Sequence, residues 1–192
     1  MSEDSVGSND LEGLVGQLGP IADEARETFG GLSAAQLNWK PGAGEWSVAQ
    51  CFDHLIVTNE SFFPLLEKVA SGEHRSGLWE RLSPFSGFFG RMVVKSVAAQ
   101  GGRKFKAPAK LLPSSSEVDG RVIERFAEHQ GELAKRLLAT KDLDLSRIVV
   151  TSPVSGFVTY SLLDGYRVVV AHERRHFEQA RRVKESEAFP RS

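Results

Sequence analysis

Apolar residues recur at intervals of three and four along four segments of this 192-residue chain, and the longest such segment is 160–183. At about 100° per residue, one face of a helix over this segment is apolar apart from two histidines and a glutamate. That face consists of Leu162, Gly165, Tyr166, Val169, His172, Glu173, His176, Ala180 and Val183. Buried imidazoles and carboxylates are unfavourable without partners. A metal ion would supply such a partner, and so would hydrogen bonds within the core.

The same spacing predicts a first helix over 11–29. Gly16, Gly19 and Pro20 are expected to weaken or kink its first half, because glycine and proline disfavour a helix interior. Gly30 then ends it, and a short helical turn is predicted near 33–37.

A second helix is predicted to begin at Ser47, which forms a capping box with Gln50, and Trp46 is placed to act as a hydrophobic staple. This helix extends to about residue 72, and Pro64 is expected to kink it. His54 lies at the edge of its apolar stripe, in the middle of the helix.

The third main helix is predicted to begin at Ser114, which forms another capping box with Glu117, and to end near Thr140. His129 falls within its apolar stripe and is a fourth core-facing imidazole. We expect it to be a hydrogen-bonded core histidine or a donor to another side chain rather than a direct metal ligand.

The remaining segments connect these helices. Within 73–113 we expect a helix near 78–100, because long unstructured loops are rare in compact domains. Its Phe-rich part is expected to pack on the body, and a substrate entrance, a dimer surface and a membrane contact are the alternatives. The pattern predicts an all-α fold with a disordered tail over 1–10 and a single domain over 11–186, in which 148–151 is briefly extended and Thr159 or Ser161 caps the last helix.

Composition narrows the function. The 24 basic and 25 acidic residues give a net charge of -1, which indicates no binding to nucleic acid or to an anionic membrane. Cys51 is the single cysteine, which excludes an internal disulfide and a cysteine-based zinc finger. The amino terminus lacks a signal peptide, and no apolar run is long enough to span a membrane, so we expect a cytoplasmic protein.

Residues 172–176 read H-E-R-R-H and match the zinc-protease motif H-E-x-x-H. His172 and His176 are four residues apart, so both side chains project from one side of a helix and can bind one metal ion. The extended motif with a further glycine and histidine is absent after His176, and no sheet is predicted to hold an extended peptide. A zinc protease is therefore the less favoured function.

A third metal ligand is better sought upstream. His54 lies near the middle of its helix, as the 172/176 pair does, and residues in the middle of facing helices meet at one level of a bundle. Three neutral imidazoles with an open coordination position are typical of a catalytic zinc site, and they also suit nickel or ferrous iron.

The order of these parts resembles the DinB/YfiT-like superfamily of metal-dependent enzymes. The resemblance rests on W-x-P-x-x-x-E-W-S-V-A-Q at 39–50, D-H-L at 53–55 and H-E-R-R-H-x-x-Q-A at 172–180. It implies a four-helix bundle with a long crossover connection between helices two and three, which leaves those helices parallel. It also implies a divalent metal ion held by His54, His172 and His176, and family members are often dimers.

Characterised members of that superfamily include thiol-dependent S-transferases and isomerases. We therefore expect a metal-dependent enzyme, a thiol-dependent S-transferase or a hydrolase, with a small-molecule substrate and a low-molecular-weight thiol among its candidate partners. Glu173 is the candidate catalytic residue, as a general base or an acceptor that orients an imidazole, and a salt bridge with an arginine is the alternative. Trp46, Phe89 or Tyr166 could line the open position.

A non-catalytic metal-binding or dimerising module is the second hypothesis. A fourth protein ligand such as His129, Asp53 or Glu173 would favour it, because a closed site leaves no position for substrate. Histidines that bind no metal are the third hypothesis.

Overall fold

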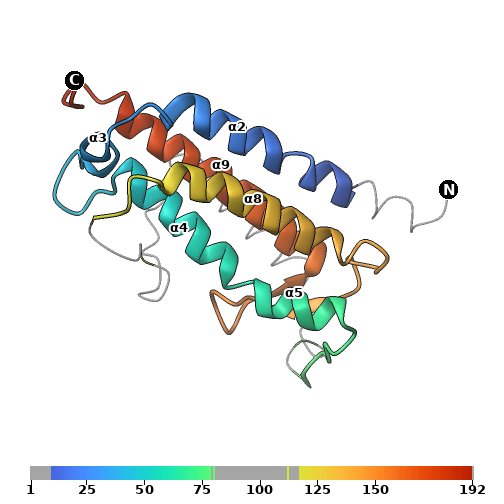
Figure 1. Cartoon of the computed structure of the whole chain (residues 1–192). Coiled ribbons are helices and arrows are strands. Elements are labelled where there is room, and N and C mark those ends of the chain that lie inside the picture. Colours follow the sequence, from blue (N-terminus) through green and yellow to red (C-terminus); the bar gives the residue numbers. More distant parts are fainter. Residues whose placement is uncertain (1–9, 79, 81–111, 113–116, 192) are drawn as a thin grey trace.

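A computed structural model describes residues 10–78, 80, 112 and 117–191. It is mainly helical, and four long helices lie alongside one another as a bundle (Figure 1). The elements are α2 (Leu18–Phe29), α3 (Ala34–Asn38), α4 (Val48–Glu60), α5 (Phe63–Ala70), α8 (Val122–Leu138), β1 (Val149–Thr151), β2 (Thr159–Ser161) and α9 (Leu162–Lys184). The predicted all-α four-helix bundle is confirmed, with one small addition, since β1 and β2 pair as an antiparallel hairpin.

The helix directions follow from the long connection. In Figure 1, α4 and α8 run the same way along the bundle, and α2 and α9 run the opposite way. α4 packs against α9 and α8, and α2 packs against α8 and α9. The crossover connection between the second and third main helices is confirmed, since a short turn cannot join two parallel neighbours.

Two apolar clusters fill the bundle. One contains Phe29, Phe52, Phe126 and Phe177, whose rings meet edge to face, with the Phe52 and Phe126 centroids 4.9 Å apart. The other surrounds the opposite end of α9 and includes Tyr166. Along α9, residues up to 170 belong to the second cluster and residues from 177 to the first. The middle of α9 therefore crosses the boundary between two apolar regions.

The third main helix begins later than predicted. α8 begins at Val122, whereas Glu117 lies in a bend and Ser114 lies outside the described residues. The reason is a tertiary contact: the Val118 N–H donates to Asn38 Oδ1 at 2.8 Å, and Asn38 Nδ2 donates to the Val118 carbonyl at 2.8 Å. This pairing holds the chain before α8 in a non-helical conformation, so the capping-box pattern there does not start a helix.

Proline and glycine break helices more sharply than predicted. α4 ends at Glu60, and α5 begins one residue before Pro64, where the missing proline N–H costs no helical hydrogen bond. Gly16 and Gln17 form a turn between the helical residues 10–15 and α2, so the predicted interruption of the first helix is confirmed.

The last helix begins at Leu162, because Tyr160 and Ser161 belong to β2. The extended segment at 148–151 is confirmed by β1. The predicted tail at 1–10 falls almost wholly outside the described residues, as does the helix expected near 78–100. No helix in the described part of the chain combines the length and apolar character of a membrane span.

Candidate metal centre

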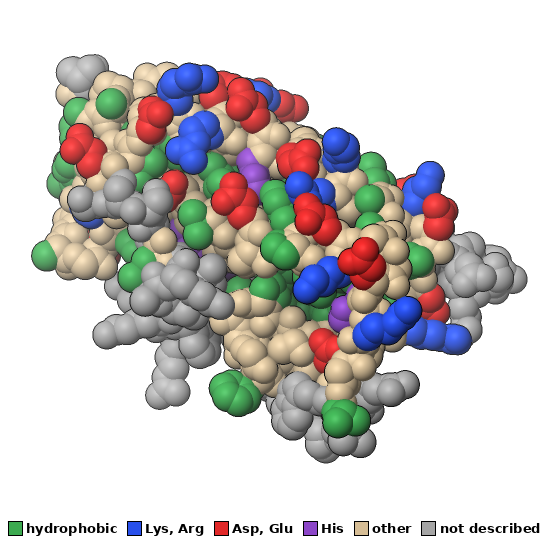
Figure 2. Space-filling view, turned by 60° about the horizontal axis from the view of Figure 1, so that its bottom comes forward, with side chains coloured by type: hydrophobic (Ala, Val, Ile, Leu, Met, Phe, Trp, Pro, Cys, Tyr) green, Lys and Arg blue, Asp and Glu red, His purple; other side chains and the backbone are tan. Residues whose placement is uncertain are grey.

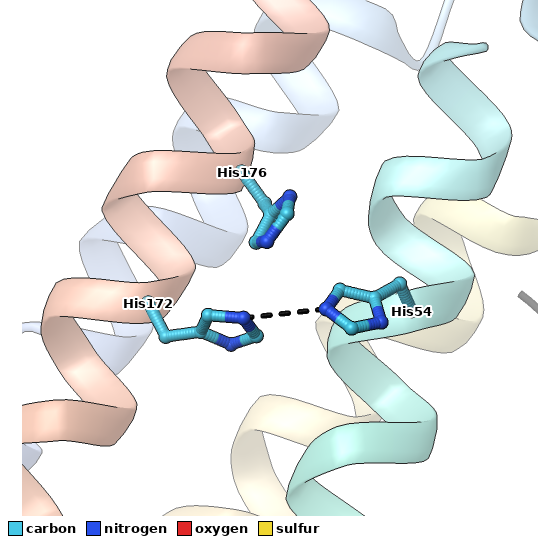
Figure 3. Close-up of side chains that lie close together, drawn as sticks. All are labelled: His54, His172 and His176. Carbon is cyan, nitrogen blue, oxygen red and sulfur yellow. Dashed lines mark hydrogen bonds between the residues drawn. The ribbon is translucent and has the colours of Figure 1, made fainter. Parts of the chain in front are cut away.

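Three imidazoles meet between α4 and α9. His54 projects from α4 toward His172 and His176, which lie one turn apart on α9 (Figure 3). The Nε2 atoms of His54 and His172 are 3.2 Å apart, and one ligand nitrogen from each of the three rings lies within 4.8 Å of the others. The fold therefore brings the three predicted metal ligands together, although His54 lies 118 positions before His172 in the chain.

Local sequence explains the position of the His54 ring. α4 begins at Ser47, whose side chain accepts a hydrogen bond from the Gln50 N–H at 3.1 Å while Gln50 Oε1 accepts from the Ser47 N–H at 3.3 Å. This predicted capping box fixes the start of α4 and hence the position of His54 within its second turn. His54 is 3% exposed, although the sequence placed it only at the edge of the apolar stripe.

A hydroxyl group lies beside the other ring nitrogen of His54. Thr58 Oγ1 is 3.4 Å from His54 Nδ1, one turn along α4. A proton on Nδ1 lets His54 donate to Thr58 and leaves the Nε2 lone pair directed toward His172. This tautomer is the one that metal ligation through Nε2 requires.

The two histidines of α9 are held in the neutral form. Burial, together with the positive charges that His176, His54 and Arg175 would present, keeps the pKa of His172 well below its usual range. Burial, with smaller effects of His54 and Arg175, lowers the pKa of His176 to about 3. Because a metal ion binds only the unprotonated ring, both side chains are ready to ligate at neutral pH.

The spacing suits a divalent transition metal ion. Zinc–nitrogen bonds of about 2.0–2.1 Å in tetrahedral geometry place two ligand nitrogens about 3.3 Å apart. The 3.2 Å between the Nε2 atoms of His54 and His172 matches that value. His176 also has a buried Nδ1 atom that lacks a hydrogen-bond partner. The residues therefore fit a metal ion, and three histidines are a donor set typical of catalytic zinc.

Trp46 forms one wall of this centre. Its ring lies 5.5 Å from that of His176 at an interplanar angle of 23° and 4.8 Å from that of His54 at 58°. It is partly buried and packs on the first apolar cluster. Two other aromatic residues were predicted to line the open coordination position. Of these, Tyr166 shares a 2.8 Å hydrogen bond with Thr140, and Phe89 lies outside the described residues.

The Glu173 side chain, next to His172 in the sequence, points into the core between α4 and α8. Its Oε1 atom accepts hydrogen bonds from Asn59 Nδ2 on α4 and Gln130 Nε2 on α8, both at 2.9 Å. All three side chains are buried, with 0%, 0% and 2% exposure for Glu173, Asn59 and Gln130. Burial raises the pKa of Glu173 to about 7, although hydrogen bonds from Gln130 and Asn59 act to lower it. The predicted catalytic role of Glu173 stays a prediction.

Asn59 and Gln130 were not recognised from the sequence. The usable signal was their position, because Asn59 follows Leu55 and Gln130 follows Phe126 by one helical turn. His129, which was placed on the core face, is only partly buried. Its ring stacks on Phe63 at 5.4 Å, and burial lowers its pKa to about 4. His129 is therefore less buried than predicted, because Gln130 occupies the inward position, although the His129 Nε2 atom is itself buried and has no hydrogen-bond partner.

Comparison with known proteins found one family and one relative. Residues 21–180 match the model of the DinB superfamily. The uncharacterized protein YuaE of Bacillus subtilis (strain 168) is 28% identical over 170 residues, which cover 86% of this chain and 96% of YuaE. No solved structure matches. With a family match over most of the described bundle, the chain belongs to the DinB superfamily.

Proposed function

We propose that this protein is a metal-dependent enzyme that uses His54, His172 and His176 to bind one divalent ion. The observation that carries the proposal is the convergence of three ligand nitrogens within 4.8 Å, from two helices. Zinc or nickel suits three imidazoles best, and ferrous iron suits them as well. When bound, such an ion supplies a Lewis acid that lowers the pKa of a thiol or a water molecule.

Charge favours an anionic partner at the open position. The three imidazoles are neutral ligands, so they do not reduce the charge of a divalent ion. Glu173 cannot neutralise it from its present position, because its Oε1 atom is bonded to two amides on the core side. Arg175 adds positive charge near His172 and His176. A thiolate or a hydroxide is the kind of ligand that this electrostatic environment stabilises.

We infer two reaction classes from that preference, transfer from or to a low-molecular-weight thiol and hydrolysis. In both, His54 is oriented by Thr58, and Trp46 excludes water from one side of the imidazoles. Figure 2 shows Lys and Arg side chains mixed with Asp and Glu over the visible face, which favours a small-molecule substrate over a nucleic acid. A cytoplasmic location and a homodimer complete the proposal.

The position of the third histidine separates this proposal from a zinc protease. His54 comes from α4, far upstream of the H-E-R-R-H segment, and Glu173 is directed into the core among amides. A protease would need Glu173 beside the metal-bound water as general base. The observed contacts favour small-molecule chemistry.

Elemental analysis of untagged protein tests the proposal. Wild type should contain about one zinc, nickel or iron ion per chain, and His54→Ala and His176→Ala should contain almost none. His129→Ala is the matched control, since it removes an imidazole outside the cluster and should retain the metal. Wild type that stays metal-free after reconstitution with zinc and nickel would sink the proposal. A positive result directs the activity screen to thiol transfer and hydrolysis.

A further inference from the structure

A buried polar cluster joins three helices beside the metal centre. We call Asn59 (α4), Gln130 (α8) and Glu173 (α9) the amide–carboxylate cluster. One atom, Glu173 Oε1, accepts both amide hydrogen bonds at 2.9 Å. Each member is at least nine-tenths buried. These two hydrogen bonds connect α9 to both of the parallel helices, α4 and α8.

The cluster does not maximise stability. Three of its oxygen atoms, Asn59 Oδ1, Gln130 Oε1 and Glu173 Oε2, are buried without a hydrogen-bond partner. Buried acceptors without donors are unfavourable, and apolar side chains of the same size would avoid that cost. The benefit of these residues therefore lies elsewhere, and buried polar groups are best attested as devices that select one helix register.

The register in question is that of the metal ligands. Glu173 directly follows His172, so the two side chains diverge by about 100° around α9. Glu173 reaches α4 and α8 on the core side while His172 meets His54. A rotation of α9 by one residue would separate Glu173 from both amides and, at the same time, His172 from His54.

We propose that Asn59, Gln130 and Glu173 are positioning residues, which fix the rotation of α9 against α4 and α8 and so aim His172 and His176 at His54. This inference rests on the proposed function, because it gives the cluster a role in metal binding. It assigns Glu173 no contact with substrate. A carboxylate is suited to the task, since a single oxygen atom can accept from two donors.

An apolar version of the cluster separates positioning from stability. The variant Asn59→Leu/Gln130→Met/Glu173→Met keeps the branched shape of the first side chain and the unbranched stems of the other two, and it removes the unpartnered oxygens. It should therefore unfold at a temperature no lower than wild type. Its affinity for Co²⁺ should nevertheless fall about 10- to 100-fold, the usual effect of losing partners that orient metal ligands. The visible absorption of bound Co²⁺ should weaken or shift, which reports a change in ligand geometry.

Glu173→Gln provides the conservative rescue. Its Oε1 atom can accept both amide hydrogen bonds, and its NH₂ group can donate to an oxygen that now lacks a partner. Affinity for Co²⁺ and the absorption spectrum should therefore match those of wild type. His129→Leu, an apolar change next to Gln130 but outside the cluster, is the control and should also leave both unchanged.

The outcomes distinguish the two proposals. Wild type that binds no Co²⁺ overturns the proposed function. Wild-type affinity and spectrum in a folded triple variant overturn the positioning role and leave the metal centre standing. If the triple variant does not fold, Gln130→Met alone decides, because unchanged affinity and spectrum in it contradict the proposal. Loss of affinity in Glu173→Gln also contradicts it, since the charge rather than the hydrogen bonds would then be needed.

Discussion

His172 and Glu173 are neighbours in the sequence and lie in different environments. His172 faces α4 beside two other imidazoles, in a partly exposed centre. Glu173 faces two amides in the fully buried core. Burial acts on both in the same sense, disfavouring the charged form, and it lowers the pKa of His172 while raising that of Glu173.

The difference lies in what each group offers to a ligand. The neutral histidines present lone pairs that converge on one point, so they can bind a cation from solution. Glu173 is enclosed by Asn59 and Gln130, and its contacts are internal to the protein. Adjacent residues of one helix can therefore serve different purposes, and a motif such as H-E-x-x-H does not by itself assign the glutamate to the metal.

Glutamine substitutions at His172 and Glu173 should show the largest difference in metal affinity. His172→Gln replaces one of the three proposed metal ligands and should weaken metal binding about a hundredfold or more, judging from roughly 10–16 kcal/mol for a four-ligand zinc site. Glu173→Gln should leave the affinity within about a factor of two of wild type. Competition with a chromogenic zinc chelator measures both. Equal losses in the two variants would show that Glu173 belongs to the metal centre.

The three histidines could be predicted from the sequence, whereas the amide–carboxylate cluster could not. The imidazole centre was predictable because His172 and His176 share a helix face, and because His54 lies in the middle of a facing helix, as the pair does. Asn59 and Gln130 were missed because isolated amides in an amphipathic helix usually face solvent. Only their spacing from Leu55 and Phe126 marked them as inward-facing, and the partner they share, Glu173, is apparent only once three helices are packed.

Helix boundaries could likewise be predicted only where neighbouring residues determine them. The capping residues Ser47 and Ser161 marked the starts of α4 and α9, because a cap depends on neighbours within one turn. The pattern at Ser114 and Glu117 failed, since the following segment is held by Asn38 from another part of the chain. Local signals were reliable where local contacts determine the structure and unreliable where a distant side chain does.

Truncating Glu173 should be the most destabilising change in the amide–carboxylate cluster. Glu173→Ala leaves both amide donors without their acceptor and creates a cavity, so we expect a loss of about 3 kcal/mol in the free energy of unfolding. Glu173→Gln should stay within about 1 kcal/mol of wild type, because it retains the acceptor. Urea denaturation of metal-free protein measures both. Similar losses in the two variants would mean that the carboxylate charge, rather than the hydrogen bonds, stabilises the core.

His129 is a third titratable residue whose pKa is shifted by burial, and its effect can be tested by varying the pH. Burial lowers its pKa to about 4, so the unfolded chain takes up a proton between the ordinary value of about 6.5 and that pKa, while the folded protein does not. The stability that the neutral ring contributes is complete above about pH 6.5 and is lost as the pH falls toward 4. His129→Gln should reduce the decline in the free energy of unfolding over this range by about 2 kcal/mol.

Denaturation series at several pH values, with metal-free wild type beside His129→Gln, check that difference. The remaining decline comes from the other titrating groups, so the comparison isolates His129. Parallel curves for the two proteins would contradict the assignment of a depressed pKa to this ring. Metal content at neutral pH should be equal in both, which separates His129 from the imidazole centre.

Trp46 should have a moderate effect confined to the imidazole centre. Trp46→Ala removes the ring stacked on His176 and tilted over His54, so metal affinity should fall about tenfold, as for other groups that orient ligands. Trp39→Ala is the control, since Trp39 also packs on the first apolar cluster but makes its ring contact with Phe189 rather than with an imidazole. Equal affinities in these two variants would show that Trp46 has no special part in the centre.

The smallest effect is expected at the start of α9, where stability and metal binding should separate. Ser161 Oγ accepts a hydrogen bond from the Asp164 N–H at 3.1 Å, which satisfies one of the unpaired amides of the first turn. Ser161→Ala should lower the free energy of unfolding by about 1 kcal/mol. Metal affinity should not change, because His172 lies almost three turns along the helix and the amide–carboxylate cluster still fixes its rotation. Ser76→Ala, at an exposed position, controls for the substitution itself. Weaker metal binding in Ser161→Ala would mean that the helix start, rather than the buried cluster, sets the direction of the histidines.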